Sequence, residues 1–181
     1  MRPLPLLVAA TALAALSLPA ARAAEAAPTT TIDSDTAESI STDTETTTTF
    51  HDNVIAQGND ITLTCDFLTV IASRIGDKSV TLGKYGKFKY LLATGNVKIV
   101  QGDRIATCGR AEVFPGEDRI VLTENPVVRI ESEGYTASGP RMVLYRGQRR
   151  AVIEGLPNQR THISLPAIKD LGFPGDKAPP K

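Results

Sequence analysis

The chain has 181 residues, and its 20 basic and 20 acidic side chains give a formal net charge of zero. Aromatic residues make up only 5% and tryptophan is absent, which argues against recognition of nucleic bases or sugars by stacking on aromatic rings. Six acids lie between Ala24 and Thr49 and two basic residues precede them, so residues 50–181 carry a net charge of +4, well below that of a nucleic-acid-binding domain.

The N-terminus has the pattern of a secretory signal peptide. Arg2 precedes an apolar run over residues 4–18, and Ala21–Ala23 offers a cleavage site of the A-x-A type. The run is shorter than the ~20 apolar residues of a membrane-spanning helix. We therefore expect residues 1–23 to be removed near Ala23 and the protein to be periplasmic; the alternative is a retained membrane anchor.

Residues 24–49 are acidic and rich in Thr and Ser, and they contain no Lys or Arg. Such a segment has little apolar surface to bury, so its ordering entropy is not offset. We predict a disordered acidic linker, of which the β-branched residues 46–50 could join the first strand.

Between Phe50 and Pro166, apolar and polar residues alternate, which is typical of strands with one buried face. Turn residues separate these runs, and none of them has a helical stripe of ten residues. The sequence therefore predicts one all-β domain over residues 50–166, followed by a flexible tail at 167–181. The predicted strands are 51–57, 60–71, 78–83, 86–93, 95–101, 104–114, 118–124, 127–132, 134–146, 149–155 and 159–165.

The strands contain a repeat. Asn53, Asn96 and Asn125 each begin a short strand, and twelve residues after each stands a small residue: Cys65, Cys108 and Ala137. A unit with one apolar face must stack on its neighbours to bury that face. The alternation slips at Asp66-Phe67 and at Gly109-Arg110, as an extra bulged residue would produce.

Cys65 and Cys108 occupy equivalent, inward-facing positions in a chain with an export signal, so a disulfide is one reading. Directly adjacent repeats would bring the two residues close enough to bond. An intervening antiparallel strand would hold them ~10 Å apart, beyond disulfide reach, and leave two buried free thiols.

The sequence offers no catalytic constellation. Its two histidines, His51 and His162, lie at opposite ends of the predicted domain, and neither has further ligands at zinc-site spacing. The glycines form turns, and none belongs to a phosphate loop or a dinucleotide fingerprint. We therefore expect a protein that is not an enzyme, has no catalytic residues, and holds no metal or cofactor.

The repeat motifs carry a family resemblance. Asn53-Val54, Gly95-Asn96-Val97 and the run Leu122–Val128, each followed by a T-[CA]-x strand, resemble the OstA-like family, also called LptA-like, of periplasmic lipopolysaccharide-transport proteins. The likeness covers about residues 50–166. It implies a V-shaped β-jellyroll of stacked antiparallel strands, open along one side, which binds lipid A acyl chains between its sheets. Members of this family join end to end by strand pairing.

This resemblance implies binding and transfer of lipopolysaccharide, or a related glycolipid, as part of a bridge from the inner to the outer membrane. We expect inward-facing apolar residues to line a lipid-binding groove, with an ordinary closed core as the alternative reading. These residues are Val54, Leu63, Leu68, Val70, Val97, Ile99, Val113, Leu122, Val127, Tyr135, Met142 and Leu144.

Two basic clusters could meet lipid phosphates, or could simply form a solvated face: Arg74, Lys78, Lys84, Lys87 and Lys89, and Arg141, Arg146, Arg149 and Arg150. The strands Phe50–Ala56 and Thr161–Leu165 are expected to be sheet edges. Such edges can pair with other OstA-like components or with a second copy, head to tail. Two rival functions are a membrane-anchored relative that hands lipid to the bridge, and a structural envelope module that binds no lipid.

Overall fold

The computed structural model describes residues 30–58 and 60–166. The predicted signal peptide (1–23) and flexible tail (167–181) lie outside these residues. The elements are β1 (Thr31–Asp33), β2 (Thr36–Ser41), β3 (Glu45–Gly58), β4 (Ile61–Ile75), β5 (Lys84–Gln101), β6 (Arg104–Phe114), the 3-10 helix η1 (Pro115–Glu117), β7 (Arg119–Thr123), β8 (Val127–Ile130), β9 (Tyr135–Ser138), β10 (Arg141–Tyr145), β11 (Arg150–Glu154) and β12 (His162–Ser164). In this described part, no helix is long and apolar enough to cross a membrane. The all-β prediction is confirmed.

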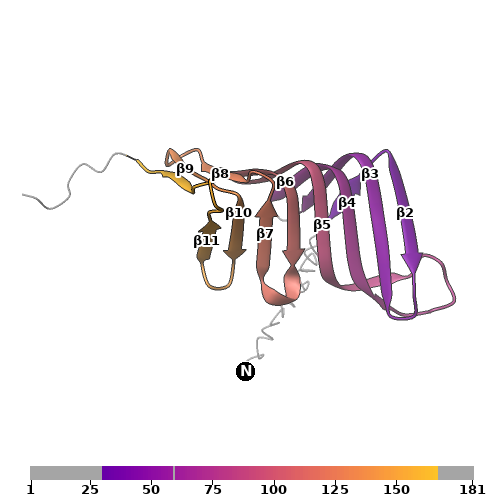
Figure 1. Cartoon of the computed structure of the whole chain (residues 1–181). Coiled ribbons are helices and arrows are strands. Elements are labelled where there is room, and N and C mark those ends of the chain that lie inside the picture. Colours follow the sequence, from indigo (N-terminus) through magenta and orange to yellow (C-terminus); the bar gives the residue numbers. More distant parts are fainter. Residues whose placement is uncertain (1–29, 59, 167–181) are drawn as a thin grey trace, which may run out of the picture.

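The strands form one continuous antiparallel sheet that folds over on itself (Figure 1). The long strands β3, β4, β5 and β6 pass through the fold and contribute one end to each half of the sheet. In the half that we call the long half-sheet, β2 flanks β3 on one side, and β7, β10 and β11 follow β6 on the other. In the short half-sheet, β1 flanks β3, and β8, β9 and β12 follow β6.

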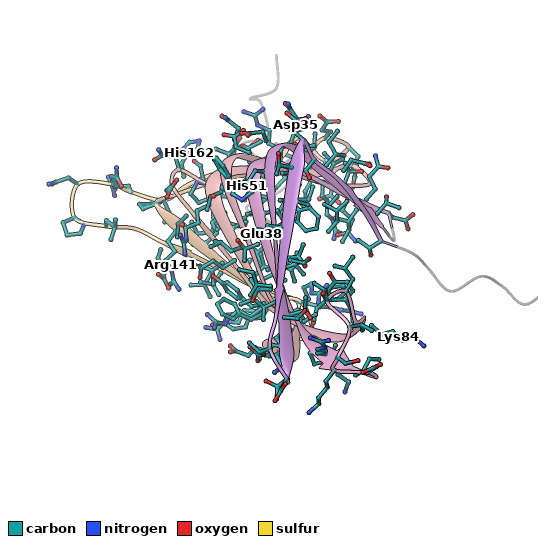
Figure 2. The ribbon with its side chains drawn as sticks, turned by 90° about the vertical axis from the view of Figure 1, so that its right-hand side faces the viewer. Asp35, Glu38, His51, Lys84, Arg141 and His162 are labelled. Carbon is teal, nitrogen blue, oxygen red and sulfur yellow. The ribbon has the colours of Figure 1, made fainter. Side chains whose placement is uncertain are left out.

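Seen along the stack of strands, the two half-sheets form a V (Figure 2). They meet near Asp35 and His51, and they diverge toward the opposite side. Between the described strands, no backbone pairing joins the free ends of the half-sheets, so the V is open along its length.

The corner of the V is produced by pairs of consecutive residues with positive φ. A left-handed pair turns the strand sharply, and Gly and Asn adopt this conformation at the least cost. The first two pairs lie within β3 and β5, each opposite a single residue of the neighbouring strand, so the register shifts there as in a bulge; the third lies between β7 and β8. The pairs are Asp52-Asn53 (φ 62° and 51°), Gly95-Asn96 (75° and 48°) and Glu124-Asn125 (63° and 59°).

These pairs coincide with the repeat predicted from Asn53, Asn96 and Asn125, which is thereby confirmed as a structural repeat. The slips were also correctly located, but the extra residue lies on the other strand. Asp52-Asn53 opposes the single residue Asp66, and Gly95-Asn96 opposes Gly109.

The core fills the inside of the V at the corner. Cys65, Cys108 and Ala137, the equivalent positions of the repeat, are all buried there, beside Val54 and Val97. Both cysteines are free, because β5 lies between the strands that carry them, with Val97 opposite Cys108. Of the two alternatives predicted for Cys65 and Cys108, the structure therefore shows two buried free thiols and not a disulfide.

The prediction of a disordered linker over residues 24–49 is wrong from residue 31 onward. This stretch forms β1, β2 and the first half of β3. Backbone pairing with β3 orders it, Ile32 packs against the core, and hydroxyl pairs add cross-strand contacts: Ser39 Oγ lies 2.7 Å from Thr48 Oγ1 and Ser41 Oγ lies 3.0 Å from Thr46 Oγ1. Thr46 and Thr48 are buried, and buried hydroxyls with partners carry little penalty.

Four predicted strands and one predicted edge also need correction. Residues 78–83 form a loop, while 86–93 and 95–101 form one strand, β5, because the turn at Gly95-Asn96 bends the chain without ending its pairing. The stretch 134–146 is divided into β9 and β10 at Gly139-Pro140, since proline supplies no backbone donor to a ladder. Phe50–Ala56 is not an edge, because β1 and β2 cover β3, whereas β12 pairs only with β9 and is an edge.

Candidate functional site

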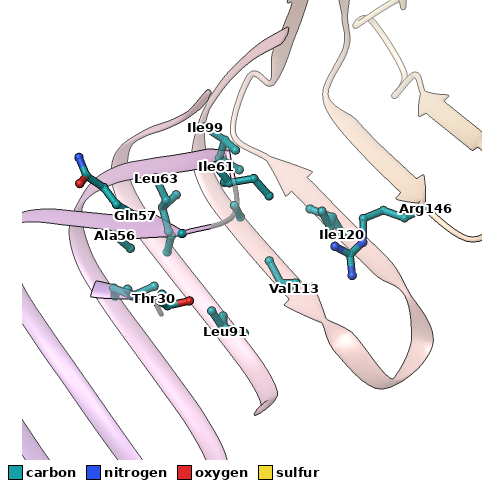
Figure 3. A pocket seen from close by; sticks show the side chains of 14 residues that line it. Thr30, Ala56, Gln57, Ile61, Leu63, Leu91, Ile99, Val113, Ile120 and Arg146 are labelled. Carbon is teal, nitrogen blue, oxygen red and sulfur yellow. The ribbon is translucent and has the colours of Figure 1, made fainter. Parts of the chain in front are cut away.

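An apolar trough lies inside the V, between the facing half-sheets (Figure 3). It encloses a hollow of about 280 Å³. The short half-sheet and the chain beside it supply one wall: Thr30, Ala56, Gln57, Gly58, Ile61, Leu63 and Ile99. The long half-sheet and the chain beside it supply the other: Leu68, Leu91, Ala93, Ala111, Val113, Ile120 and Arg146.

Strand register explains why these side chains meet. In antiparallel pairs, residues directly opposite each other point to the same face. Leu63 lies opposite Ile99, which places both on the inner face of the short half-sheet. In the long half-sheet, Leu91 lies opposite Val113, and Val113 lies opposite Ile120, so these three form a continuous apolar row.

On β5, β6, β7 and β10, exposure increases from the corner toward the mouth of the V, whereas on β4 the outer residue Val70 stays buried. The row nearest the corner runs through Leu68, Ala93, Ala111, Leu122 and Met142, all of which are buried. The next row outward contains the half-buried Leu91, Val113, Ile120 and Leu144. In the inner row, Leu68, Ala93 and Ala111 therefore form the floor of the trough, and the outer row leaves apolar surface available to a ligand.

Sequence comparison agrees with this architecture. The sequence family described as LptA/(LptD N-terminal domain) LPS transport protein matches residues 31–150. The chain belongs to this family. The match begins at β1, so the strands that composition had predicted to be a linker are part of the family domain.

A solved structure has the same fold. It is the crystal structure of LptH, described as the LptA homologous periplasmic component of the conserved lipopolysaccharide transport device from Pseudomonas aeruginosa. The TM-score is 0.59 at 15% sequence identity, over 77% of this chain and 96% of that one. At this identity the likeness establishes the fold, and it confirms the expected LptA-like β-jellyroll. No curated protein sequence matches the chain.

The structure divides the predicted groove residues of this LptA-like domain into three groups. Those that line the trough are Leu63, Leu68, Ile99 and Val113. Those that are buried in the core without lining it are Val54, Val70, Val97, Leu122 and Met142. Tyr135 and Leu144 pack at the edge of the core, and Val127 is half-buried outside it.

Several wall residues were not predicted, including Leu91, Ile120 and Ile61. Leu91 and Ile120 belong to the same cross-strand row as Val113, which was predicted. Knowing which residues of neighbouring strands lie opposite each other would have identified Leu91 and Ile120. The alternation of apolar and polar residues within a single strand does not show which strands are neighbours.

Among residues 30–58 and 60–166, Arg146 is the one charged residue that lines the trough. Its Nη2 lies 2.9 Å from Oδ1 of Asp118, and its backbone amide donates to the carbonyl oxygen of the same residue at 2.9 Å. Both side chains are about half exposed. This ion pair places a cation at one end of an otherwise apolar surface, where it can meet an anionic group on a ligand.

The two predicted basic clusters have different surroundings. In the C-terminal cluster, Arg141 pairs with Glu154 at 2.5 Å, Arg150 lies over the ring of Tyr145, and Arg146 reaches the trough. The cluster at residues 74–89 is on the β4–β5 hairpin, and none of its residues lines the trough.

Neither cysteine is placed for chemistry. Burial raises the pKa of Cys65 to about 11, with a further contribution from the Asp66 carboxylate, and burial also raises the pKa of Cys108 to about 11. At neutral pH both are therefore protonated, and a thiol in that state is a poor nucleophile. Their role is packing in the corner of the fold.

Proposed function

We propose that this protein holds acyl chains of lipopolysaccharide, or of a related glycolipid, in the trough and passes them on within a bridge between the two membranes. The observation that carries the proposal is the row of half-buried apolar residues on the open side of the V, in a domain of the lipopolysaccharide-transport family. The apolar N-terminal run over residues 4–18, followed by the site at Ala21–Ala23, supports export to the periplasm.

The physical advantage of a trough is the removal of hydrocarbon from water. Exposing one methylene group costs about 0.8 kcal/mol, so a bare twelve-carbon chain costs on the order of 10 kcal/mol. Walls formed by Leu63, Ile99, Leu91 and Val113 cover such a chain without any bond being made or broken. Transfer along an apolar surface needs no catalytic residue, and an energy source elsewhere sets its direction.

The ends of the stack support assembly with other LptA-like domains. Among the described strands, β1 and β2 are unpaired on their outer side at one end, as are β11 and β12 at the other. The first end displays the exposed acids Asp33 and Glu38, and the second displays the exposed bases Arg150 and Arg160. Opposite charges at the two ends favour head-to-tail pairing of edge strands.

Lipid extraction tests the proposal. Protein purified from the periplasm without detergent should release a glycolipid with several acyl chains into organic solvent, detected by mass spectrometry. An I99D variant should release much less, because a carboxylate in the wall penalises hydrocarbon there. Folded wild-type protein that repeatedly yields no lipid would favour a structural module instead. N-terminal sequencing separates a cleaved signal peptide from a retained anchor.

A further inference from the structure

The hairpin between β4 and β5 carries a group of exposed apolar side chains that do not line the trough. Of the eleven large hydrophobic side chains that are exposed in the described residues, five lie between residues 75 and 88: Ile75, Val80, Leu82, Tyr85 and Phe88. Leu82 is the most exposed of all, at 75%. Exposed apolar side chains gathered in one short segment are characteristic of an interaction site.

The same segment is strongly basic. Residues 74–89 contain five basic side chains and a single acid, Asp77, for a net charge of +4. The lysines at 78, 84, 87 and 89 are all exposed, and within the described residues only Lys89 forms an ion pair, with Glu45 at 2.5 Å. Three lysine charges on this hairpin are therefore available to an anionic partner.

Internal hydrogen bonds hold the hairpin loop in shape. Arg74 Nη2 donates to the carbonyl oxygens of Asp77 (3.3 Å), Lys78 (3.0 Å) and Val80. The Asp77 carboxylate accepts from the amide and hydroxyl of Ser79 at 2.8 and 2.7 Å. Because Arg74 is engaged within the loop, the lysines and apolar residues are presented outward without rearrangement.

The hairpin is also anchored to the body of the protein. The hydroxyl groups of Tyr85 and Thr48 lie 2.9 Å apart, and Ser41 Oγ donates to the carbonyl oxygen of Thr81 at 3.3 Å. Figure 2 shows Lys84 on the side toward which the V opens, projecting away from the sheets. The hairpin thus forms a protruding corner beside the mouth of the trough.

We propose that this hairpin docks onto a membrane surface that contains anionic phospholipids. The lysines lie on both sides of Leu82 along the chain, at positions 78, 84 and 87. A membrane presents phosphate groups in a layer directly above hydrocarbon, so it satisfies interspersed cations and apolar side chains together. The proposal concerns the outside of the fold and does not depend on what the trough holds.

Vesicle sedimentation tests the proposal with the purified protein. The wild type should bind vesicles of phosphatidylcholine mixed with phosphatidylglycerol, and should bind pure phosphatidylcholine and high-salt samples weakly. L82D and the double variant K84E/K87E should each weaken binding about tenfold or more. The matched variants L156D and K98E change exposed residues outside residues 74–89 and should bind like wild type. I99D, which alters the trough wall, should also bind like wild type.

A tryptophan probe gives an independent readout, because the chain contains no tryptophan. L82W should show a blue-shifted emission on anionic vesicles, with binding at least as strong as wild type, whereas L156W should not shift. Equal binding by L82D and wild type, no binding by wild type, or an unshifted L82W spectrum would overturn the proposal. A protein complex that is lost in L82D, without vesicle binding, would assign the hairpin to a protein partner instead.

Discussion

Asn96 Nδ2 donates a 2.9 Å hydrogen bond to Asp66 Oδ2 across the corner of the V. The equivalent residue of the preceding repeat, Asn53, makes the same bond to Asp35 Oδ2 at 2.7 Å. In both repeats a left-handed asparagine turns its own strand and ties the neighbouring segment of the chain to the turn. The open angle of the trough is therefore built into the backbone of each repeat.

The corner should tolerate no side chain at Gly95. A Cβ there would lie 2.8 Å from Cβ of Asp66, and its φ of +75° is unfavourable for alanine. We expect G95A to lower the free energy of unfolding by about 1–3 kcal/mol, measured by urea denaturation. G116A is the matched control, because nothing lies within 4 Å of a Cβ at that position. Equal midpoints for the two variants would contradict this account of the corner.

The repeat could be predicted because it depends on local chemistry, whereas the V shape was expected only from the family resemblance. Asn at 53, 96 and 125 marks the left-handed turns, and the fixed spacing to Cys65, Cys108 and Ala137 marks the next buried position. The sequence did not show which of the two paired strands carries the extra residue, because a bulge can interrupt the alternation of apolar and polar residues on either strand. Wall residues such as Leu91 were missed for a related reason: they follow from strand order, which a single strand does not encode.

The buried thiols should react slowly and should make stability depend on pH. At pH 8, raising a pKa from 9.0 to about 11 lowers the thiolate fraction about 100-fold. Labelling of native protein by a disulfide reagent should be slower than labelling in urea by at least that factor. Rapid labelling of both thiols in native protein would show that the corner is open to solvent.

The sign of the pH effect follows from the same shift. The unfolded chain loses its thiol protons near pH 9, before the folded chain does, so ionisation favours unfolding. The stabilising contribution should be complete below pH 9 and should disappear as the pH rises toward 11. The double variant C65A/C108A should therefore have a flatter stability profile over this range, measured by urea midpoints. If the stability of the double variant fell with pH as steeply as that of the wild type, the pH effect would not come from the two thiols.

The buried core and the wall of the trough should respond differently to truncation. Leu122 is fully buried, so L122A should cost about 2–5 kcal/mol of stability through lost burial and a cavity. Val113 is half-buried on the wall, so V113A should cost about 1 kcal/mol or less. Differential scanning calorimetry of both variants checks the order. A larger loss for V113A would mean that the wall is a closed core.

Head-to-tail assembly should depend on the β2 edge. Ile40 is 62% exposed on this strand, and a lysine there is a typical block to edge pairing. We expect I40K to weaken concentration-dependent self-association at least tenfold in sedimentation velocity, with stability changed by less than about 0.5 kcal/mol. I55K, on the covered strand β3, is the control with the same chemistry. A wild type that stays monomeric at every concentration would contradict assembly by this edge.

The acidic segment shows where composition misleads. Average hydrophobicity predicted disorder over residues 24–49, yet β2 is held by cross-strand hydroxyl pairs, Ser39–Thr48 and Ser41–Thr46. Thr-rich segments have high strand propensity, and a pairing partner in β3 satisfies their polar groups. A count of charged and apolar residues reflects neither the strand propensity of Thr nor the presence of a pairing partner.

Photo-crosslinking at adjacent positions of β5 tests the central claim most directly. Ile99 lines the trough, whereas Lys98 is exposed on the opposite face of the same strand. A photoreactive residue at 99 should capture lipopolysaccharide in intact cells, and the same residue at 98 should not. Equal capture at the two positions, or capture at 98 alone, would show that the interior of the V does not hold the lipid.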